Sequence, residues 1–208
     1  MLAAHVALVS EESKITIGEL TSVAGALSKQ ISRDFGPIWQ VNADVAANAR
    51  LEDMPLDYWP IIVKDDIGDP SAAGYHEDKH GQPFSLVQHD SSWSLTASHE
   101  FLEMLADPFG RRVIAGESPM NGQGRVNFLV EVCDPCEASD FAYTINVIQV
   151  SDFPTPNFFD PVPSAGVRYS YTGSLSAPRQ VLKEGYLSWY LPASKQWWKD
   201  LVLRRQAE

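Results

Sequence analysis

The chain has 208 residues, of which 44% are hydrophobic and 21% are charged. This balance is typical of a folded protein with one sizeable core or two small, closely associated cores. Sixteen Lys and Arg against 27 Asp and Glu give a formal net charge of -11, which repels nucleic-acid backbones and anionic lipid head groups, so we expect no nucleic-acid partner. A solvated acidic surface, or carboxylates gathered around metal ions, would account for the charge.

The N-terminal segment lacks the features of an export signal. It has no basic start, and its apolar run ends at Ser10-Glu11-Glu12, too early for a signal peptide with a cleavage site. No later segment approaches the roughly 18 apolar residues that span a bilayer. We therefore expect a soluble protein without a signal peptide, membrane segment or membrane partner, cytoplasmic by default.

The first half of the sequence predicts strands alternating with helices. A buried strand over His5–Ser10 is followed by a capping box at Thr16 and Glu19. Apolar residues then recur at spacings of three and four, which predicts a helix that ends near Phe35-Gly36-Pro37. Further strands are predicted over residues 43–51 and 59–64, with a loop over 65–70.

A second helix is predicted directly after another strand. The strand covers Phe84–His89 and follows Gly74-Tyr75-His76 and a polar turn over 79–82. The helix should begin near Ser94 or Thr96 and end at Asp107, because the proline at 108 disfavours helical geometry in the residue before it.

The second half predicts strands joined by proline-rich connections. These strands cover residues 126–132, 143–150 and 166–172, and an aromatic-rich stretch follows over 185–198. We expect these aromatic side chains to pack in the core, with a sugar or peptide platform as the alternative. We predict one α+β domain over residues 1–208, with a sheet and motif helix in a lobe over 1–108 and a strand-rich lobe over 109–208.

The helix predicted before Pro108 carries the string SHEFLEMLADP. At about 100° per residue, His99, Glu103 and Asp107 share one face, and Glu100 lies at its edge. This is the geometry of H-E-x-x-H metal helices, with a glutamate in place of the second histidine. The pattern predicts His99 and Glu103 as metal ligands, and the alternative is a solvated helix with a chance His-Glu pair.

A third ligand is expected from an acidic cluster at the end of a strand. Glu131 is the preferred ligand, and Asp134 would hold the ring N–H of the metal-bound histidine. The roles of Glu131, Asp134 and Glu137 can be exchanged, and Asp107, otherwise a supporting carboxylate, is a fourth contender. The sequence thus predicts a divalent metal site, with Zn2+ as the first choice.

These residues resemble the pattern of the zincins, and most closely of the gluzincins, the group of thermolysin. His99, Glu100, Asp107, Glu131 and Asp134 match it, and the string H-E-x-x-E-x-x-x-D-P resembles a group of bacterial and phage-associated proteins and the exordium-like proteins of plants. The resemblance runs from about residue 74 onward. It implies a zincin-like fold, with a mixed sheet, an N-terminal helix and a central motif helix, and a metallohydrolase, most simply a peptidase acting on peptides or proteins.

In such an enzyme Glu100 would be the general base that takes a proton from the attacking water. A nearby donor would stabilise the oxyanion. The candidates for that donor are Tyr143, which we favour, Tyr75, Tyr169 and His89.

The strand before the motif helix matches the position of the zincin edge strand that pairs with extended peptide substrate. Phe84, Leu86 and His89 are therefore predicted to bind substrate. The alternative is an ordinary sheet edge.

Glu103 marks a departure from the H-E-x-x-H pattern. Zinc held by one histidine and two glutamates has its double charge formally cancelled, so it polarises water less strongly, and oxygen-rich ligation widens the choice to manganese or calcium. The alternative function is a non-catalytic zincin-fold binding or assembly protein, such as a phage-related one, with a structural or vestigial metal site.

Two smaller motifs have alternative interpretations. Cys133 and Cys136 form a C-x-x-C, which is a redox pair, half a zinc knuckle or, as we favour, a pair of small residues that shape a turn. His76 and His80 lie in a polar segment, and we expect surface histidines, with a minor metal site as the alternative.

Overall fold

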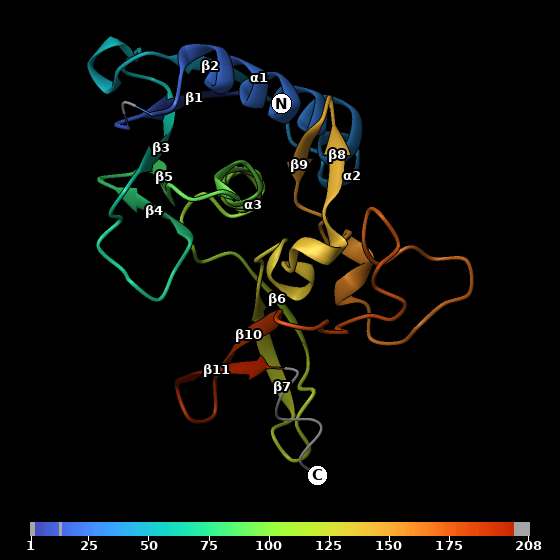
Figure 1. Cartoon of the computed structure of the whole chain (residues 1–208). Helices are drawn as coiled ribbons and strands as arrows, with labels where there is room; N and C mark the ends of the chain where they lie inside the picture. Colours follow the sequence, from blue (N-terminus) through green and yellow to red (C-terminus); the bar gives the residue numbers. More distant parts are fainter. Residues whose placement is uncertain (1–2, 13, 202–208) are drawn as a thin grey trace. The chain divides into compact units, whose positions relative to one another are not determined.

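The computed structural model describes residues 3–12 and 14–201 and divides into two compact units (Figure 1). The first unit contains the chain up to Gly110 together with Tyr143–Ser151, and the second contains Arg111–Ala142 and the chain from Asp152 onward. Helices and mixed and antiparallel sheets confirm the α+β class. In the described residues no helix has the length and apolar character needed to cross a membrane.

A mixed five-stranded sheet forms the centre of the first unit, in the order β2-β1-β3-β5-β4. β1, β2, β3 and β5 run parallel to one another, and β4 pairs with β5 in the antiparallel sense. The predicted strands of this unit are confirmed at β1, β2, β3 and β5. The strands are β1 (Ala4–Ser10), β2 (Ala43–Asn48), β3 (Trp59–Lys64), β4 (Gly74–Lys79) and β5 (Gln82–Gln88).

β4 and β5 correct the sequence analysis in two respects. The turn predicted over 79–82 is confirmed between β4 and β5, but the polar segment before it, with Glu77, Asp78 and Lys79, is an unpredicted strand at the edge of the sheet. β5 lies between β3 and β4, so the prediction that it is a sheet edge is wrong. The side chains of Phe84 and Leu86 alternate with buried Ser85 and Val87 and therefore point to the opposite face of the sheet.

The first helix is longer than predicted. α1 (Ile17–Lys29) begins with the predicted Thr16–Glu19 capping box and continues through a π-helical segment, Gln30–Phe35, into α2 (Gly36–Trp39). The helical stretch ends at Trp39, two residues beyond the predicted stop near Pro37, because the proline lies in the first turn of α2, where its missing N–H is not needed. A Cβ at Gly36 would lie 2.5 Å from the Ile31 carbonyl oxygen, so the tight passage requires glycine.

The motif helix α3 (Trp93–Ala106) ends one residue before the predicted end, and Asp107 is its C-cap. Its buried apolar residues include Phe101, Leu102 and Met104. α3 packs against β5 and β4 on one side and against the hairpin β8 (Tyr143–Ile145) and β9 (Ile148–Val150) on the other (Figure 1). The sheet and hairpin thus enclose the helix that carries the motif.

An antiparallel four-stranded sheet in the order β11-β10-β7-β6 forms the second unit. Trp189 is fully buried in it, as expected for core packing, and so is Phe128, but Trp197 is 56% exposed. The strand predicted over 166–172 is wrong, because only an isolated bridge joins Ser170 to Pro154. The strands are β6 (Val113–Glu117), β7 (Arg125–Leu129), β10 (Tyr186–Leu191) and β11 (Gln196–Leu201), and short 3-10 turns cover Leu51–Asp53, Asp134–Cys136, Ser139–Phe141 and Pro156–Phe159.

Candidate metal centre

Four ionisable side chains meet where α3 faces β4. Nδ1 of His76 lies 3.7 Å from a carboxylate oxygen of Glu100 and 3.7 Å from one of Glu103. The same Glu103 oxygen lies 3.3 Å from Nε2 of His99. The side chains of His76, Glu100 and Glu103 are 5–6% exposed and that of His99 is 14% exposed. The predicted meeting of His99 and Glu103 on one helix face is confirmed, and Glu103 is also close to a second histidine.

His76 belongs to this cluster and is not the surface histidine expected from the sequence. Residues on a strand alternate between its two faces, so His76 points to α3 while Tyr75 and Glu77 point the other way. The order Gly74-Tyr75-His76 is compatible with a strand, but the charged residues after it are typical of a turn, so the strand was not predicted. His80, at the turn between β4 and β5, is exposed as expected.

A backbone carbonyl fixes the orientation of the His76 ring. Nε2 of His76 lies 3.2 Å from the carbonyl oxygen of Asp107, the residue that ends α3. Because a carbonyl only accepts hydrogen bonds, Nε2 must carry the proton, and in the neutral ring Nδ1 presents its lone pair to Glu100 and Glu103. This is how metal-bound histidines are commonly held. The supporting role predicted for the Asp107 carboxylate stays a prediction.

The two glutamates and His76 form a group that suits a cation. Ligand atoms of His76, Glu100 and Glu103 lie within 4.8 Å of one another. Two buried carboxylates and an imidazole lone pair converge, and their mutual repulsion falls when a proton or a metal ion lies between them. One nitrogen and two carboxylates are a ligand set that zinc and manganese accept, so the residues fit a divalent metal.

In the absence of metal, protons fill the same role. Burial alone would lower the pKa of His76, but its interaction with Glu100 and the charges of Glu103 and Asp107 outweigh burial and raise the pKa. Burial raises the pKa of the Glu100 carboxyl above its ordinary value of 4.5, against the opposing effects of His76 and His99. The cluster therefore holds protons to a higher pH than its separate groups would.

We expect the metal-free protein to lose stability as pH rises. A group whose pKa is raised by folding stabilises the protein fully below its unfolded pKa and loses that contribution as pH rises through its folded pKa. For Glu100 the loss starts above about pH 4.5 and for His76 above about pH 6.5. Thermal melts in chelator between pH 5 and 8.5 should show a decline of several °C.

Two controls accompany these melts. Glu100→Gln, which cannot ionise, should flatten the decline. Saturating zinc should reverse the trend, because metal replaces the protons. Melting temperatures in chelator that rise across this range would contradict the protonation pattern.

Gly74 allows β4 to approach α3 closely. A Cβ at this position would lie 2.7 Å from Cγ2 of Thr96 and 2.9 Å from Cγ and Oε1 of Glu100. Because Glu100 is enclosed, it cannot swing away without leaving the cluster. The absence of a side chain at Gly74 therefore sets the position of a candidate ligand.

Gly74→Ala should weaken metal binding about tenfold, the lower end of the effect of groups that orient a ligand. Isothermal titration with zinc measures this change. Gly25→Ala is the matched control, because a Cβ there meets nothing within 4 Å and the residue lies inside α1. An unchanged zinc affinity in Gly74→Ala would show that Glu100 can move freely or does not bind metal.

A buried polar network anchors the residue before His99. Oγ of Ser98 donates to Oε1 of Gln30 at 2.8 Å and accepts from the Ser151 N–H at 2.9 Å. Nε2 of Gln30 donates to the Ser151 carbonyl at 3.0 Å, which closes the ring. The network ties α3 to the π-helical segment and to the end of the β8–β9 hairpin.

The candidate oxyanion donors have other partners. The Tyr143 hydroxyl donates to the buried carboxylate of Asp34 at 2.9 Å, and the Tyr169 hydroxyl accepts from the Ser164 N–H at 2.7 Å. Tyr143 thus joins β8 to the π-helical segment. Its role as an oxyanion donor stays a prediction.

His89 lies at the C-terminal end of β5, where Nδ1 is 3.0 Å from a carboxylate oxygen of Asp65. Glu12 accepts from the Asp65 N–H at 2.7 Å, and the three side chains form a second group of possible ligands. The substrate-binding role predicted for Phe84, Leu86 and His89 depended on an edge strand, so it is not carried forward.

The remaining predicted site residues belong to the second unit. Glu131 follows β7, and the buried Asp134 starts the 3-10 turn that ends at Cys136. The cysteines are free and buried, and Cys136 N–H donates to the Cys133 carbonyl at 3.1 Å, as expected of a turn. The roles of Glu131 as third ligand and of Asp134 as its supporting carboxylate stay predictions.

Comparisons with protein-family models, with curated proteins and with solved structures found no match. The candidate site therefore rests on the residues and their geometry.

Proposed function

We propose that the protein is a divalent-metal-dependent hydrolase of peptides, with its metal centre between α3 and β4. The observation that carries this proposal is the buried convergence of His76 Nδ1 with the carboxylates of Glu100 and Glu103. Zinc is the first candidate and manganese the second, because the set contains one nitrogen and two oxygens. When bound, such a metal would supply Lewis-acid activation of water and of a substrate carbonyl.

The side chains around the cluster divide the remaining tasks. Glu103 lies against both histidines and would hold the centre together. His99 is the most exposed of the four and is held by Glu103, so it is placed to accept a proton from a water molecule that arrives from solvent. The Asp107 carbonyl keeps Nδ1 of His76 available to the metal.

The sequence supports a second ligand set. In the zincin-like set, His99, Glu103 and Glu131 bind the metal and Glu100 is the general base. Both sets contain Glu103, and they differ in the role of His76. The geometry within the first unit favours the set with His76, because its three ligand atoms already lie together.

Peptides suit the edge of the sheet beside this centre. β4 is an edge strand of the sheet, and in the described part of the chain no strand pairs with its outer side. An extended peptide can pair with such an edge through backbone hydrogen bonds. The zincin-like substrate strand expected at β5 is therefore proposed for β4, which carries His76.

A peptide-library digest tests the proposed function. Purified zinc-loaded protein is incubated with a mixed-sequence library, and mass spectrometry detects new termini. Cleavage should be lost with chelator, with His76→Ala and with Glu103→Gln, and kept with His80→Ala. The absence of metal-dependent cleavage by a protein that holds zinc would overturn the hydrolase.

That last outcome would favour a metal-stabilised binding or assembly protein. One observation supports this second candidate: two carboxylate ligands formally cancel the charge of a divalent ion and so weaken its activation of water. In that case Glu103→Gln would lower the melting temperature, and neither the variant nor the wild type would cleave peptides.

A further inference from the structure

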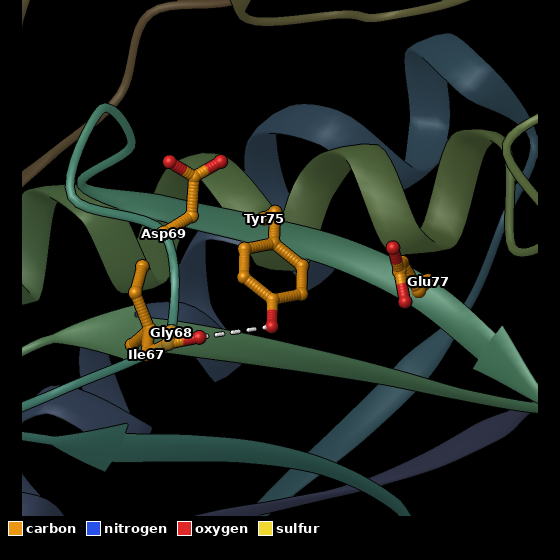
Figure 2. Close-up of a pocket in the computed structure, with 5 residues that line it drawn as sticks. All are labelled: Ile67, Gly68, Asp69, Tyr75 and Glu77. Atoms are coloured by element: carbon orange, nitrogen blue, oxygen red, sulfur yellow. Dashed lines mark hydrogen bonds between the residues drawn. The ribbon is translucent and has the colours of Figure 1, made fainter.

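Beside the candidate metal centre, on the opposite face of β4, the structure has an open pocket of about 380 Å³. Ile67, Gly68 and Asp69 line it from the loop before β4. Tyr75 and Glu77 contribute from the strand itself. Figure 2 shows Tyr75 and Glu77 on β4 and Asp69 on the loop before it, with the Tyr75 hydroxyl donating to the Ile67 carbonyl oxygen at 3.1 Å.

The pocket carries two negative charges around an aromatic face. Asp69 accepts from the N–H and hydroxyl of Ser71 at 2.8 and 2.6 Å, which lowers its pKa and keeps it ionised. Tyr75 and Glu77 project from the same face of β4, and Asp69 lies on the loop before it, so both carboxylates line the pocket together with the ring. Within the described residues, neither carboxylate forms an ion pair with Lys, Arg or His.

The pairing of β4 with β5 determines where a peptide would meet this pocket. The Gln88 N–H donates to the Ala73 carbonyl at 2.7 Å. In an antiparallel ladder, the backbone groups of Tyr75 and Glu77 then face β5, and those of Gly74 and Asp78 face outward. A peptide paired with the outer side of β4 therefore places alternate side chains beside Tyr75 and Glu77. The side chains between them point to the other face of the sheet, where the metal centre lies.

We infer that this pocket binds a lysine or arginine side chain of an extended peptide paired with β4, which makes basic peptides the preferred substrates. The inference depends on the peptide-binding part of the proposed function. The alkyl stem of a basic side chain would lie along the Tyr75 ring, and its cation would lie between Asp69 and Glu77. The acidic side chains of β4 disfavour a second copy of the chain as the occupant, because like charges would meet across the pair.

Fluorescence anisotropy of three dye-labelled peptides tests the inference. The peptides alternate threonine and valine and differ only in a central lysine, norleucine or glutamate. Zinc-loaded wild type should bind the lysine peptide about tenfold more tightly than the norleucine peptide, from partly exposed charge pairs and a cation–π contact. The glutamate peptide should bind most weakly.

Two double variants locate the preference. Asp69→Asn with Glu77→Gln removes both charges and keeps an acceptor for Ser71, so the lysine and norleucine peptides should then bind equally. Glu52→Gln with Asp57→Asn makes the same charge change at exposed positions between β2 and β3, and should keep the tenfold preference. Equal binding of the peptides by wild type, a preference that survives the pocket variant, or no binding of any peptide would overturn the inference.

Mass spectrometry of the same mixtures separates this inference from hydrolysis. Lysine-selective binding without cleavage would support the pocket and contradict the hydrolase. Cleavage without selectivity would support the hydrolase and contradict the pocket.

Discussion

Replacing His76 by alanine is expected to abolish tight metal binding. Removal of the only nitrogen in the set formed by His76, Glu100 and Glu103 leaves two buried carboxylates to hold the ion. The affinity for zinc should fall by at least about 100-fold, since even groups that only orient a ligand are worth about 10–100-fold. Isothermal titration at fixed pH measures the loss.

His80→Ala is the matched control, because it removes an exposed histidine four residues further along the same hairpin. His99→Ala distinguishes the two ligand sets. If His76 binds the metal, His99→Ala should keep stoichiometric zinc. Full zinc binding in His76→Ala together with its loss in His99→Ala and Glu131→Gln would instead establish the zincin-like set.

Ser98→Ala should destabilise the protein while leaving the candidate ligands intact. Its hydroxyl satisfies both Gln30 and the Ser151 N–H in a fully buried position. Leaving these groups without that partner should lower the free energy of unfolding by about 1–3 kcal/mol. Urea denaturation followed by tryptophan fluorescence measures the difference.

Ser94→Ala, on the same helix, is the control for helix propensity. Its side chain is only partly buried, so the change should stay within about 0.5 kcal/mol. Equal stability of wild type and Ser98→Ala would show that water replaces the hydroxyl and that the network does not position α3.

Local sequence patterns were sufficient to predict the elements that carry the motif. The capping box at Thr16, the alternation in β5 and the proline after Asp107 each act within a few residues, and the structure has these elements close to the expected bounds. The face shared by His99 and Glu103 follows from helix geometry alone.

The identity of the edge strand and the place of His76 depend on pairing between distant segments. No local pattern shows that β4 pairs with β5 and forms the edge of the sheet, because a strand of charged residues resembles a turn in sequence. The contact between His76 and Glu103 exists only once that strand has been added to the sheet. The sequence shows the departure from H-E-x-x-H at Glu103, but it does not show that His76 on β4 lies close to Glu103.

The most direct test is elemental mass spectrometry of purified wild type, prepared without added metal and without a chelating tag. We predict about one zinc or manganese ion per chain, removed by chelator with a lower melting temperature and restored by titration. If the protein contains no stoichiometric metal, and if neither zinc nor manganese raises the melting temperature of the chelated protein, the convergence of His76, Glu100 and Glu103 is not a metal centre.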